Sequence, residues 1–311
     1  MAITAKDVQT LREMTGVGMM DCKKALTASN GDMDKAIEFL REKGLAAAQK
    51  KAGRIAAEGI VVALVDQNGV GAVVEVNSET DFVAKNETFQ SFVQSVAAVV
   101  AAENPADLED LMGKQFPGTD KTITEMQQEK ILVIGENIKV RRFGRYADGV
   151  SVPYIHMGGK IGVLVNLAVS DNLKSSDKVT ELGKDIAMQI AAMRPQFLDK
   201  SDVDSTTLDK EREILLIQAK EENSKSAKPK PDAIVEKMVE GRVGKYYEEN
   251  CLLQQAFVKE NKVSVEKHVE AVAKELGGTI AVKGFIRFEK GEGIEKKEEN
   301  FAEEIAKQLA Q

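Results

Sequence analysis

An internal repeat constrains the fold of this 311-residue chain more than any other feature of its sequence. The segment Gly71-Ala-Val-Val-Glu-Val aligns with Gly162-Val-Leu-Val-Asn-Leu at an offset of about 90 residues. In the same way, Val96-Ala-Ala-Val-Val-Ala-Ala, which ends at Pro105, aligns with Ile186-Ala-Met-Gln-Ile-Ala-Ala, which ends before Pro195. A repeat of this length predicts two related subdomains.

The first copy of the repeat combines a β-hairpin with a helix. Alternating apolar residues at 60–65 and 72–76 flank a turn at 66–69, which is typical of a hairpin. Residues 88–102 then predict a helix that is closed by Asn104-Pro105. Strands grouped with helices, without strict alternation, favour an α+β fold. We therefore predict a duplicated α+β core of antiparallel hairpin sheets packed on helices.

Further segments complete this predicted core. Residues 121–130 have a helical pattern, residues 131–134 indicate a turn, and residues 138–146 indicate another strand. Residues 279–288 predict the strand that closes the second subdomain.

The first 50 residues predict three short helices. Thr4 and Asp7 form a capping-box pattern at the start of the first helix. A glycine-bounded loop at 16–20 leads to Asp21, which we expect to be the N-cap of the second helix. Asn30-Gly31-Asp32 then turns the chain into the third helix.

Additional helices are expected outside the two cores. Residues 44–57 are rich in alanine and lysine and predict a helical tether. Two sparse apolar stripes flank Lys228-Pro-Lys-Pro231, which predicts an antiparallel helical hairpin. Residues 298–310 predict a terminal amphipathic helix, hinged by Gly291-Glu-Gly293. The predicted domains are a helical module with its linker (1–54), the first core subdomain (55–148), the second core subdomain (149–197 with 251–290), the inserted helical hairpin (198–250) and a C-terminal helical module (291–311).

Composition excludes several classes of protein. The net charge is -7 and there is no long run of lysine and arginine, which argues against direct nucleic-acid binding. Apolar runs stay well below the roughly 20 residues that cross a bilayer, and the first residues lack the pattern of a signal peptide. Cys22 and Cys251 have no CxxC spacing, which suggests reduced thiols. We therefore expect a cytoplasmic protein without a membrane partner.

One basic cluster stands out within residues 138–146. Its members are Lys139, Arg141, Arg142 and Arg145. We interpret it as a solvated strand face, with a contact surface as the alternative.

The motifs of common enzymes are missing. There is no GxxxxGK[ST] segment, and the three GxG segments lack the third glycine of a dinucleotide loop. The two histidines, His156 and His268, have no ligand spacing that would propose zinc. Neither cysteine has an adjacent base. We expect no catalytic residues, no cofactor and no metal site.

The segment Glu75-Val-Asn-Ser-Glu-Thr-Asp-Phe-Val-Ala-Lys-Asn86 places an aromatic ring between acid and base just outside the first hairpin. Phe82 could fold back into the core, or it could project as an anchor for a partner's pocket. The corresponding connection of the second copy, residues 169–177, has ordinary loop residues with only Leu173 near that place. This comparison favours the anchor. Beside a nucleotide site that depends on Mg²⁺, such a ring together with the Asp81 carboxylate could disturb metal coordination.

Three segments resemble the elongation factor Ts family. Leu11-Arg-Glu-Met-Thr-Gly-Val-Gly-Met-Met-Asp-Cys-Lys-Lys-Ala-Leu26 resembles its first signature, and Glu75 to Lys85 resembles its second. The run from Gly284 to Lys296 is also similar, so the resemblance covers the whole chain in order. It implies a guanine nucleotide-exchange factor for elongation factor Tu, with an amino-terminal module like a ubiquitin-associated domain. In that family the module and the terminal helix grip the GTPase domain.

The resemblance also implies partner-binding residues. The Thr-Asp-Phe-Val motif of the family falls on Thr80, Asp81, Phe82 and Val83, which would intrude near the Mg²⁺ site, and its Ile-Gly pair falls on Ile134 and Gly135. Val17, Met19 and Met20 would be the apolar contact of the helical module, with core methionines as the alternative. His156 matches a family histidine, although Met157-Gly-Gly-Lys departs from the family pattern after it, and a structural histidine is the alternative.

Two rival functions remain. A non-exchanging interaction or chaperone-like module for a GTPase would use the same helices but would not need the motif at 80–83. An enzyme that uses the cleft between the repeats is disfavoured by the missing motifs. The sequence leaves the oligomeric state open, with a homodimer or a heterotetramer among the alternatives.

Overall fold

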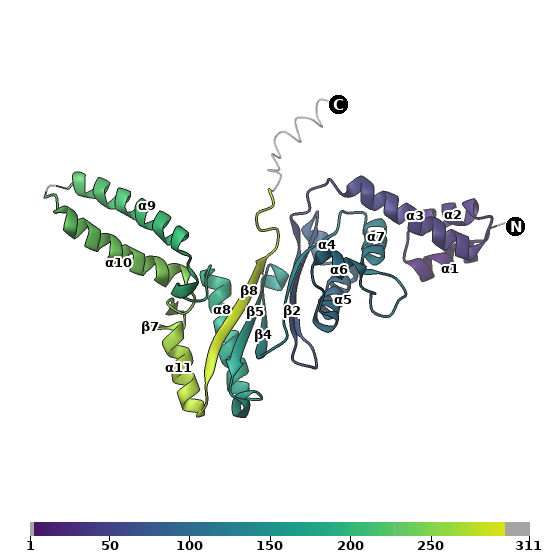
Figure 1. The fold of residues 1–311 in the computed structure, drawn as a ribbon. Coiled ribbons are helices and arrows are strands. Elements are labelled where there is room, and N and C mark those ends of the chain that lie inside the picture. Colours follow the sequence, from purple (N-terminus) through teal and green to yellow (C-terminus); the bar gives the residue numbers. More distant parts are fainter. Residues whose placement is uncertain (1–2, 227, 296–311) are drawn as a thin grey trace.

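The computed structural model describes residues 3–226 and 228–295. Figure 1 shows a three-helix module at one side of the molecule, two antiparallel sheets in the middle and a long helical hairpin at the other side. This mixture of helices and small antiparallel sheets confirms the predicted α+β class. The limits drawn between the domains stay predictions.

The N-terminal module contains α1 (Ala5–Thr15), α2 (Met19–Ala28) and α3 (Met33–Lys51). The capping box between Thr4 and Asp7 is present as predicted. The N-cap of α2 is Gly18, so the prediction of Asp21 was wrong. Asp21 lies instead in the first turn of α2 and forms an ion pair with Lys43 of α3.

Helix α3 is one continuous helix that docks on the core, whereas the sequence predicted a separate tether from residue 44. It packs along α7 (Ile123–Ile134). Arg41 forms an ion pair with Glu125, and the Nζ of Lys51 donates a hydrogen bond to the carbonyl of Ile131 at 3.4 Å. Residues 131–134 belong to α7, so the predicted turn there was wrong. The module is therefore held against the core along one helix.

The two central sheets have the same construction. The first has the order β1 (Glu58–Val65), β2 (Gly71–Ser78), β3 (Lys139–Tyr146), and the second has the order β4 (Val150–His156), β5 (Ile161–Val169), β8 (Ile280–Glu289). Helices α5 (Glu87–Glu103), α6 (Leu108–Gly113) and α7 accompany the first sheet. Helices α8 (Asp177–Met193) and α11 (Val265–Leu276) pack on the second.

The repeat extends to irregular details of the backbone. Opposite the central strands β2 and β5, the neighbouring strands β3 and β8 each carry a β-bulge, at Arg141 and at Lys283, next to the equivalent positions Glu75 and Asn166. Helices α5 and α8 are both 17 residues long. Each ends at a residue in the left-handed conformation, with φ of 49° at Asn104 and 51° at Arg194. These shared features confirm two related subdomains.

The sheets pack against each other face to face, and their helices cover the outer faces. On β2, Val74 points to α5 whereas Val73 points to the opposite sheet, because strand side chains alternate. Glycines allow the sheets to come close. A Cβ at Gly144 would lie 2.5 Å from Ile286 Cδ1, and one at Gly162 would overlap Val61.

A helical hairpin and a small sheet complete the described chain. Helices α9 (Ser205–Ser224) and α10 (Asp232–Asn250) lie antiparallel, as predicted, and bury Ala219, Val235 and Val239 between them. Strands β6 (Ala256–Phe257) and β7 (Glu260–Ser264) follow. The predicted helix at 298–310 lies outside the described residues. No helix of the described chain combines the length and the apolarity needed to cross a membrane.

The substitution Gly162→Ala should destabilise the core by about 2 kcal/mol, because overpacking of a close contact between sheets strains both sides. The reason is the overlap of the new methyl group with the branched side chain of Val61. The midpoint of urea unfolding measures the effect. Gly113→Ala is the matched control, since nothing lies within 4 Å of a Cβ there. An unchanged midpoint for Gly162→Ala would show that the two sheets do not need this close approach.

Candidate functional site

Phe82 lies on an exposed turn of helix between the first hairpin and α5. Thr80 is the N-cap of α4 (Asp81–Ala84), and its side chain accepts a hydrogen bond from the Val83 amide. Phe82 is 80% exposed, whereas Val83 is buried in the core under the first sheet. Phe82 therefore does not plug the core, which was the first of the two alternatives.

The second copy of the repeat shows which residue is extra. From this connection between hairpin and helix on, the copies are offset by 90 residues, as the starts of α5 at Glu87 and α8 at Asp177 show. Leu173, 90 positions after Val83, ends the short 3-10 helix η2 (Asp171–Leu173) and is buried in the core of the second subdomain. Leu173 is thus the counterpart of Val83, and Asn172 is the counterpart of Phe82. The scaffold needs the buried residue in both copies. The exposed ring occurs only in the first.

Glu136 holds the Phe82 turn against the end of α7. Its carboxylate accepts hydrogen bonds from the amides of Glu79 and Thr80, both at 3.0 Å, and from the Thr80 hydroxyl at 2.6 Å. Gly135 makes this contact feasible, because its φ of 87° ends α7 and turns the chain towards the loop. The structure therefore brings Thr80–Val83 together with the predicted pair of half-buried Ile134 and exposed Gly135.

A charged pair flanks the exposed ring. Lys85 Nζ lies 2.7 Å from the Asp81 carboxylate and 6.0 Å from the centre of the Phe82 ring. The hydrogen bond from Lys85 lowers the pKa of the Asp81 carboxyl below its ordinary value, so Asp81 is ionised at neutral pH. The site presents an apolar ring next to the ion pair of Asp81 and Lys85. This arrangement suits the binding of another protein.

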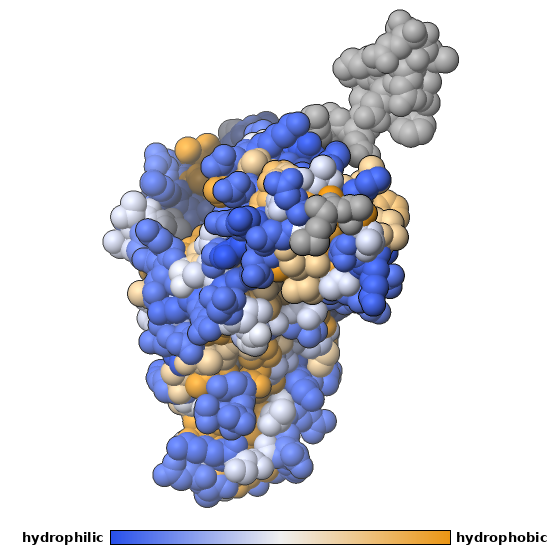
Figure 2. Space-filling model, turned by 90° about the vertical axis from the view of Figure 1, so that its right-hand side faces the viewer, coloured by the Kyte–Doolittle hydropathy of each residue, from blue (hydrophilic) through white to orange (hydrophobic). Residues whose placement is uncertain are grey.

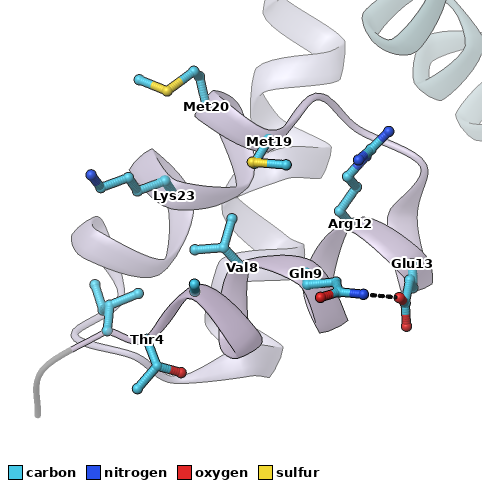
Figure 3. A pocket seen from close by; sticks show the side chains of 10 residues that line it. Thr4, Val8, Gln9, Arg12, Glu13, Met19, Met20 and Lys23 are labelled. Carbon is cyan, nitrogen blue, oxygen red and sulfur yellow. Dashed lines mark hydrogen bonds between the residues drawn. The ribbon is translucent and has the colours of Figure 1, made fainter.

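A groove of about 730 Å³ lies between α1 and α2 in the helical module. Figure 3 shows the Met19 side chain over the groove near Val8, and Met20 at its outer edge. Met19 is 56% exposed and Met20 is 66% exposed, so neither is a core residue. Figure 2 looks onto this side of the molecule, where small apolar patches interrupt a hydrophilic surface.

Val17 is placed differently from the two methionines. It is only 4% exposed and packs in the core of the module with Leu11 and Cys22. The glycine-bounded loop is therefore shorter than predicted, because α2 already begins at Met19. The Val17 side chain is thus buried in the free protein and does not line the groove, and its role in partner binding stays a prediction.

His156 lies at the end of β4. Its Nδ1 is 3.0 Å from the hydroxyl of Tyr154, and the two rings are 6.0 Å apart. The ring is half-buried. A partner within the same strand fits the structural alternative for this histidine. Its role in partner binding stays a prediction.

The basic cluster is not a solvated strand face, so that interpretation was wrong. Arg141 Nη1 lies 2.9 Å and Arg142 Nε lies 2.5 Å from the carboxylate of Glu75, which is fully buried. Arg145 donates to the carbonyl of Ala101 at 3.1 Å. Only Lys139 points to solvent. The three arginine side chains therefore bind groups of this protein itself.

Sequence reasoning missed the roles of Glu75 and Glu136. Glu75 carried a signal, because a carboxylate inside the apolar run 72–76 must find cationic or amide partners once the strand is buried. Glu136 carried no such signal, since its partners lie 56 and 57 positions earlier in the chain.

Within residues 3–226 and 228–295, no group of three His, Cys, Asp or Glu side chains lies close enough together to bind a metal ion.

Comparison with known proteins gives a consistent picture. The model of a protein family described as Elongation factor TS matches residues 79–292. Elongation factor Ts of Clostridium perfringens (strain SM101 / Type A) is 54% identical over 308 residues, which is 98% of each chain. The proteins of the same name from Clostridium kluyveri and Clostridium acetobutylicum are 51% identical over 311 residues and 50% identical over 312 residues, with 99% of each chain covered.

The substitution Glu136→Gln should loosen the Phe82 turn without unfolding the core, because a neutral amide offers a single, weaker acceptor in place of a carboxylate. We expect the amides of Glu79 and Thr80 to exchange with deuterium about tenfold faster. Hydrogen exchange resolved by NMR measures this. Glu129→Gln is the control, since this carboxylate of α7 pairs with Lys121 and not with the turn. Equal protection in Glu136→Gln and wild type would mean that other contacts hold the turn.

Proposed function

Because this chain belongs to the elongation factor Ts family and is therefore a translation elongation factor, we propose that it is a guanine nucleotide-exchange factor for elongation factor Tu. It binds the GDP form of that GTPase and promotes release of GDP, so that GTP can reload. The observation that carries this proposal is the 80% exposure of Phe82 on a turn held by Glu136, a ring that the second copy of the repeat lacks.

The proposed action is that of a wedge. Transfer of an exposed phenylalanine side chain into an apolar pocket is favourable by about 1.5–3 kcal/mol, which drives the ring into the partner. Entry beside the partner's Mg²⁺ and phosphate site brings the ionised Asp81 with it. A carboxylate is a hard oxygen ligand and competes with the groups that hold Mg²⁺. Both effects lower the affinity of the GTPase for GDP.

Such a factor performs no bond chemistry. If binding of the exchange factor lowers the GTPase's affinity for GDP a given number of times, thermodynamic linkage requires bound GDP to lower the GTPase's affinity for the exchange factor by the same ratio. A ternary complex therefore forms, loses GDP and is resolved by GTP. The protein is accordingly not an enzyme in the sense of carrying catalytic groups. Its place would be the cytoplasm, where translation supplies the GTPase.

The other predicted contacts supply affinity. Met19 and Met20 border a groove lined by apolar and by charged side chains, which suits the mixed surface of a partner protein. Ile134 and Gly135 adjoin the Phe82 turn through Glu136, so they extend the same contact surface. His156 would contact the partner from the second subdomain. A heterotetramer with the partner, or a homodimer, is compatible with these surfaces.

Phe82→Ala should slow GDP release at least about tenfold at saturating factor, because the loss of a central aromatic anchor typically costs about 2 kcal/mol or more. Asp81→Ala should slow release less, since the wedge remains. Stopped-flow release of a fluorescent GDP from elongation factor Tu measures both. Because Phe82 is exposed, its removal should leave thermal stability unchanged.

Asn172→Ala is the matched control, since it alters the equivalent position of the second copy. Elongation factor Tu should release GDP at the wild-type rate in the presence of this variant. An unchanged rate for Phe82→Ala would remove the wedge from the mechanism. If wild-type protein binds the GTPase but leaves GDP release unaltered, the non-exchanging interaction module is the correct function.

Met19→Ala and Met20→Ala should each raise the half-saturating concentration about fivefold and leave the maximal rate of GDP release unchanged, since they remove about 1 kcal/mol of apolar contact. Val17→Ala provides the contrast. Because Val17 is buried in the small core of the module, its truncation should lower the melting temperature by opening a cavity. A concentration series of the stopped-flow assay separates affinity from rate, and wild-type half-saturation for both methionine variants would refute the groove as a contact.

A further inference from the structure

Helices α3 and α7 lie in direct contact where the helical module meets the first core subdomain. Gly44 of α3 is buried at this contact, and a Cβ there would lie 3.4 Å from the carbonyl oxygen of Gln128 and 3.9 Å from Leu132 Cδ2. Gln128 and Leu132 are four positions apart and therefore share one face of α7. Figure 1 shows α3 leading from the module to the first subdomain, with α7 beside it. The absence of a side chain at Gly44 lets α3 lie against the backbone of α7.

Each of the two units receives an apolar side chain from the other. Leu132 of α7 packs against the core of the helical module, which includes Leu40 of α3. Among the described residues that pack on this core, Leu132 alone comes from outside the module. In return, Ala48 of α3 packs against the core of the first subdomain. Separation of α3 from α7 would expose apolar surface of both units to water, which opposes independent movement of the module.

The ion pair between Arg41 and Glu125 does not account for this docking by itself. The two side chains are 48% and 37% exposed. Exposed ion pairs contribute little to stability, because water and salt screen them. The apolar contact made by Leu132 is therefore the main candidate for the interaction that holds the module.

The chain that leaves α3 is bound to the core as well. The buried side-chain amide of Asn137 donates a hydrogen bond to the carbonyl of Arg54 at 2.8 Å. The backbone amide of Asn137 donates to the Glu79 carboxylate at 2.6 Å, and Arg54 Nη1 lies 3.5 Å from the same carboxylate. Arg54 comes three positions after the end of α3 at Lys51. The connection between module and core is therefore fixed almost from the point where the helix ends.

The same part of the chain holds the Phe82 turn. Asn137 follows Glu136, whose carboxylate accepts hydrogen bonds from the amides of Glu79 and Thr80. Helix α7 thus carries the module through Leu132 and leads directly to the support of the Phe82 turn at its C-terminal end. The relative position of the module groove and the exposed ring is set through this one helix.

We propose that Leu132 is a positioning residue for partner binding: it fixes the helical module on α7, so that the groove at Met19 and Met20 and the ring of Phe82 meet the same GTPase at a set spacing. This inference rests on the proposed function. It assigns Leu132 no contact with the partner. Leu132 acts by keeping two contact surfaces aligned before the partner arrives, which raises the effective concentration of the second contact once the first has formed.

The test compares variants of the full chain by the release of fluorescent GDP from elongation factor Tu. Leu132→Ala should raise the half-saturating concentration about tenfold and leave the maximal rate within about twofold, because the Phe82 turn is unchanged and only the alignment of the module is lost. Leu132→Met should stay within about twofold of wild type in both quantities, since it conserves the apolar volume. Met33→Ala is the matched control. Met33 packs on the same core from inside the module, so its truncation should change half-saturation less than about twofold.

Residual dipolar couplings of the free protein, measured by NMR, provide a readout without the partner. In wild type, the amides of the module and of the first subdomain should fit one common alignment tensor, because α3 and α7 move together. In Leu132→Ala the two units should require different tensors. Gly44→Leu should have the same effect with Leu132 in place, because the larger side chain meets the backbone of α7. Gly241→Leu is the control for this change, since nothing lies within 4 Å of a Cβ at that position of α10.

The two readouts decide the inference together. If Leu132→Ala does not fold, Gly44→Leu replaces it in both experiments. One common tensor for the variant would overturn the positioning role, and so would wild-type half-saturation in a variant whose units have different tensors. A lower maximal rate with unchanged half-saturation would overturn it as well. Wild-type protein without any effect on GDP release would overturn the proposed function itself, whereas the couplings would still show whether Leu132 fixes the module.

Discussion

The contact between the two three-stranded sheets is the interaction on which the rest of this structure depends. Because one face of each central strand meets a helix and the other meets the opposite sheet, β2 and β5 are apolar along most of their length. Glycines such as Gly144 and Gly162 let the strands approach closely. The helices α5 and α8 are therefore confined to the outside. The connections between strands and helices come to lie at the ends of the sheets, where they are free to differ.

The duplication separates what the scaffold needs from what the function needs. Val83 and Leu173 are buried at equivalent positions, so each copy requires an apolar residue there. At the neighbouring position one copy has an exposed Phe82 and the other has Asn172. Stability of the fold does not explain that difference, because the second copy folds without a ring. The explanation that we propose is a role towards another molecule.

Sequence reasoning succeeded where the determining residues are close together. The cap at Thr4, the turn at 66–69 and the antiparallel hairpin of α9 and α10 each depend on a few neighbouring positions. It failed where partners are distant. Arg141 and Arg142 were predicted to be solvated because their partner, the Glu75 carboxylate, lies 66 and 67 positions earlier in the chain. Gly291 was predicted to be part of a hinge, but its amide donates a hydrogen bond to the same carboxylate, 216 positions earlier. Val17, which the resemblance places in an apolar contact, is buried because three helices close over it, and the sequence does not show this. The exposure of Phe82 was favoured by comparison of the two copies of the repeat and was implied by the family resemblance, not by local composition.

The exposure of Phe82 follows from the geometry of its support. Neighbouring residues of a helical turn point in directions about 100° apart, so burial of Val83 turns Phe82 outward. The Thr80 cap and the Glu136 carboxylate hold that turn, which prevents the ring from folding back onto its own core. In a flexible loop with the same sequence, the ring would pack against its own protein. On binding, the loop would have to break that contact and would lose conformational entropy. A ring that is held in water before the partner arrives avoids both costs, and its apolar surface is available in full for the complex.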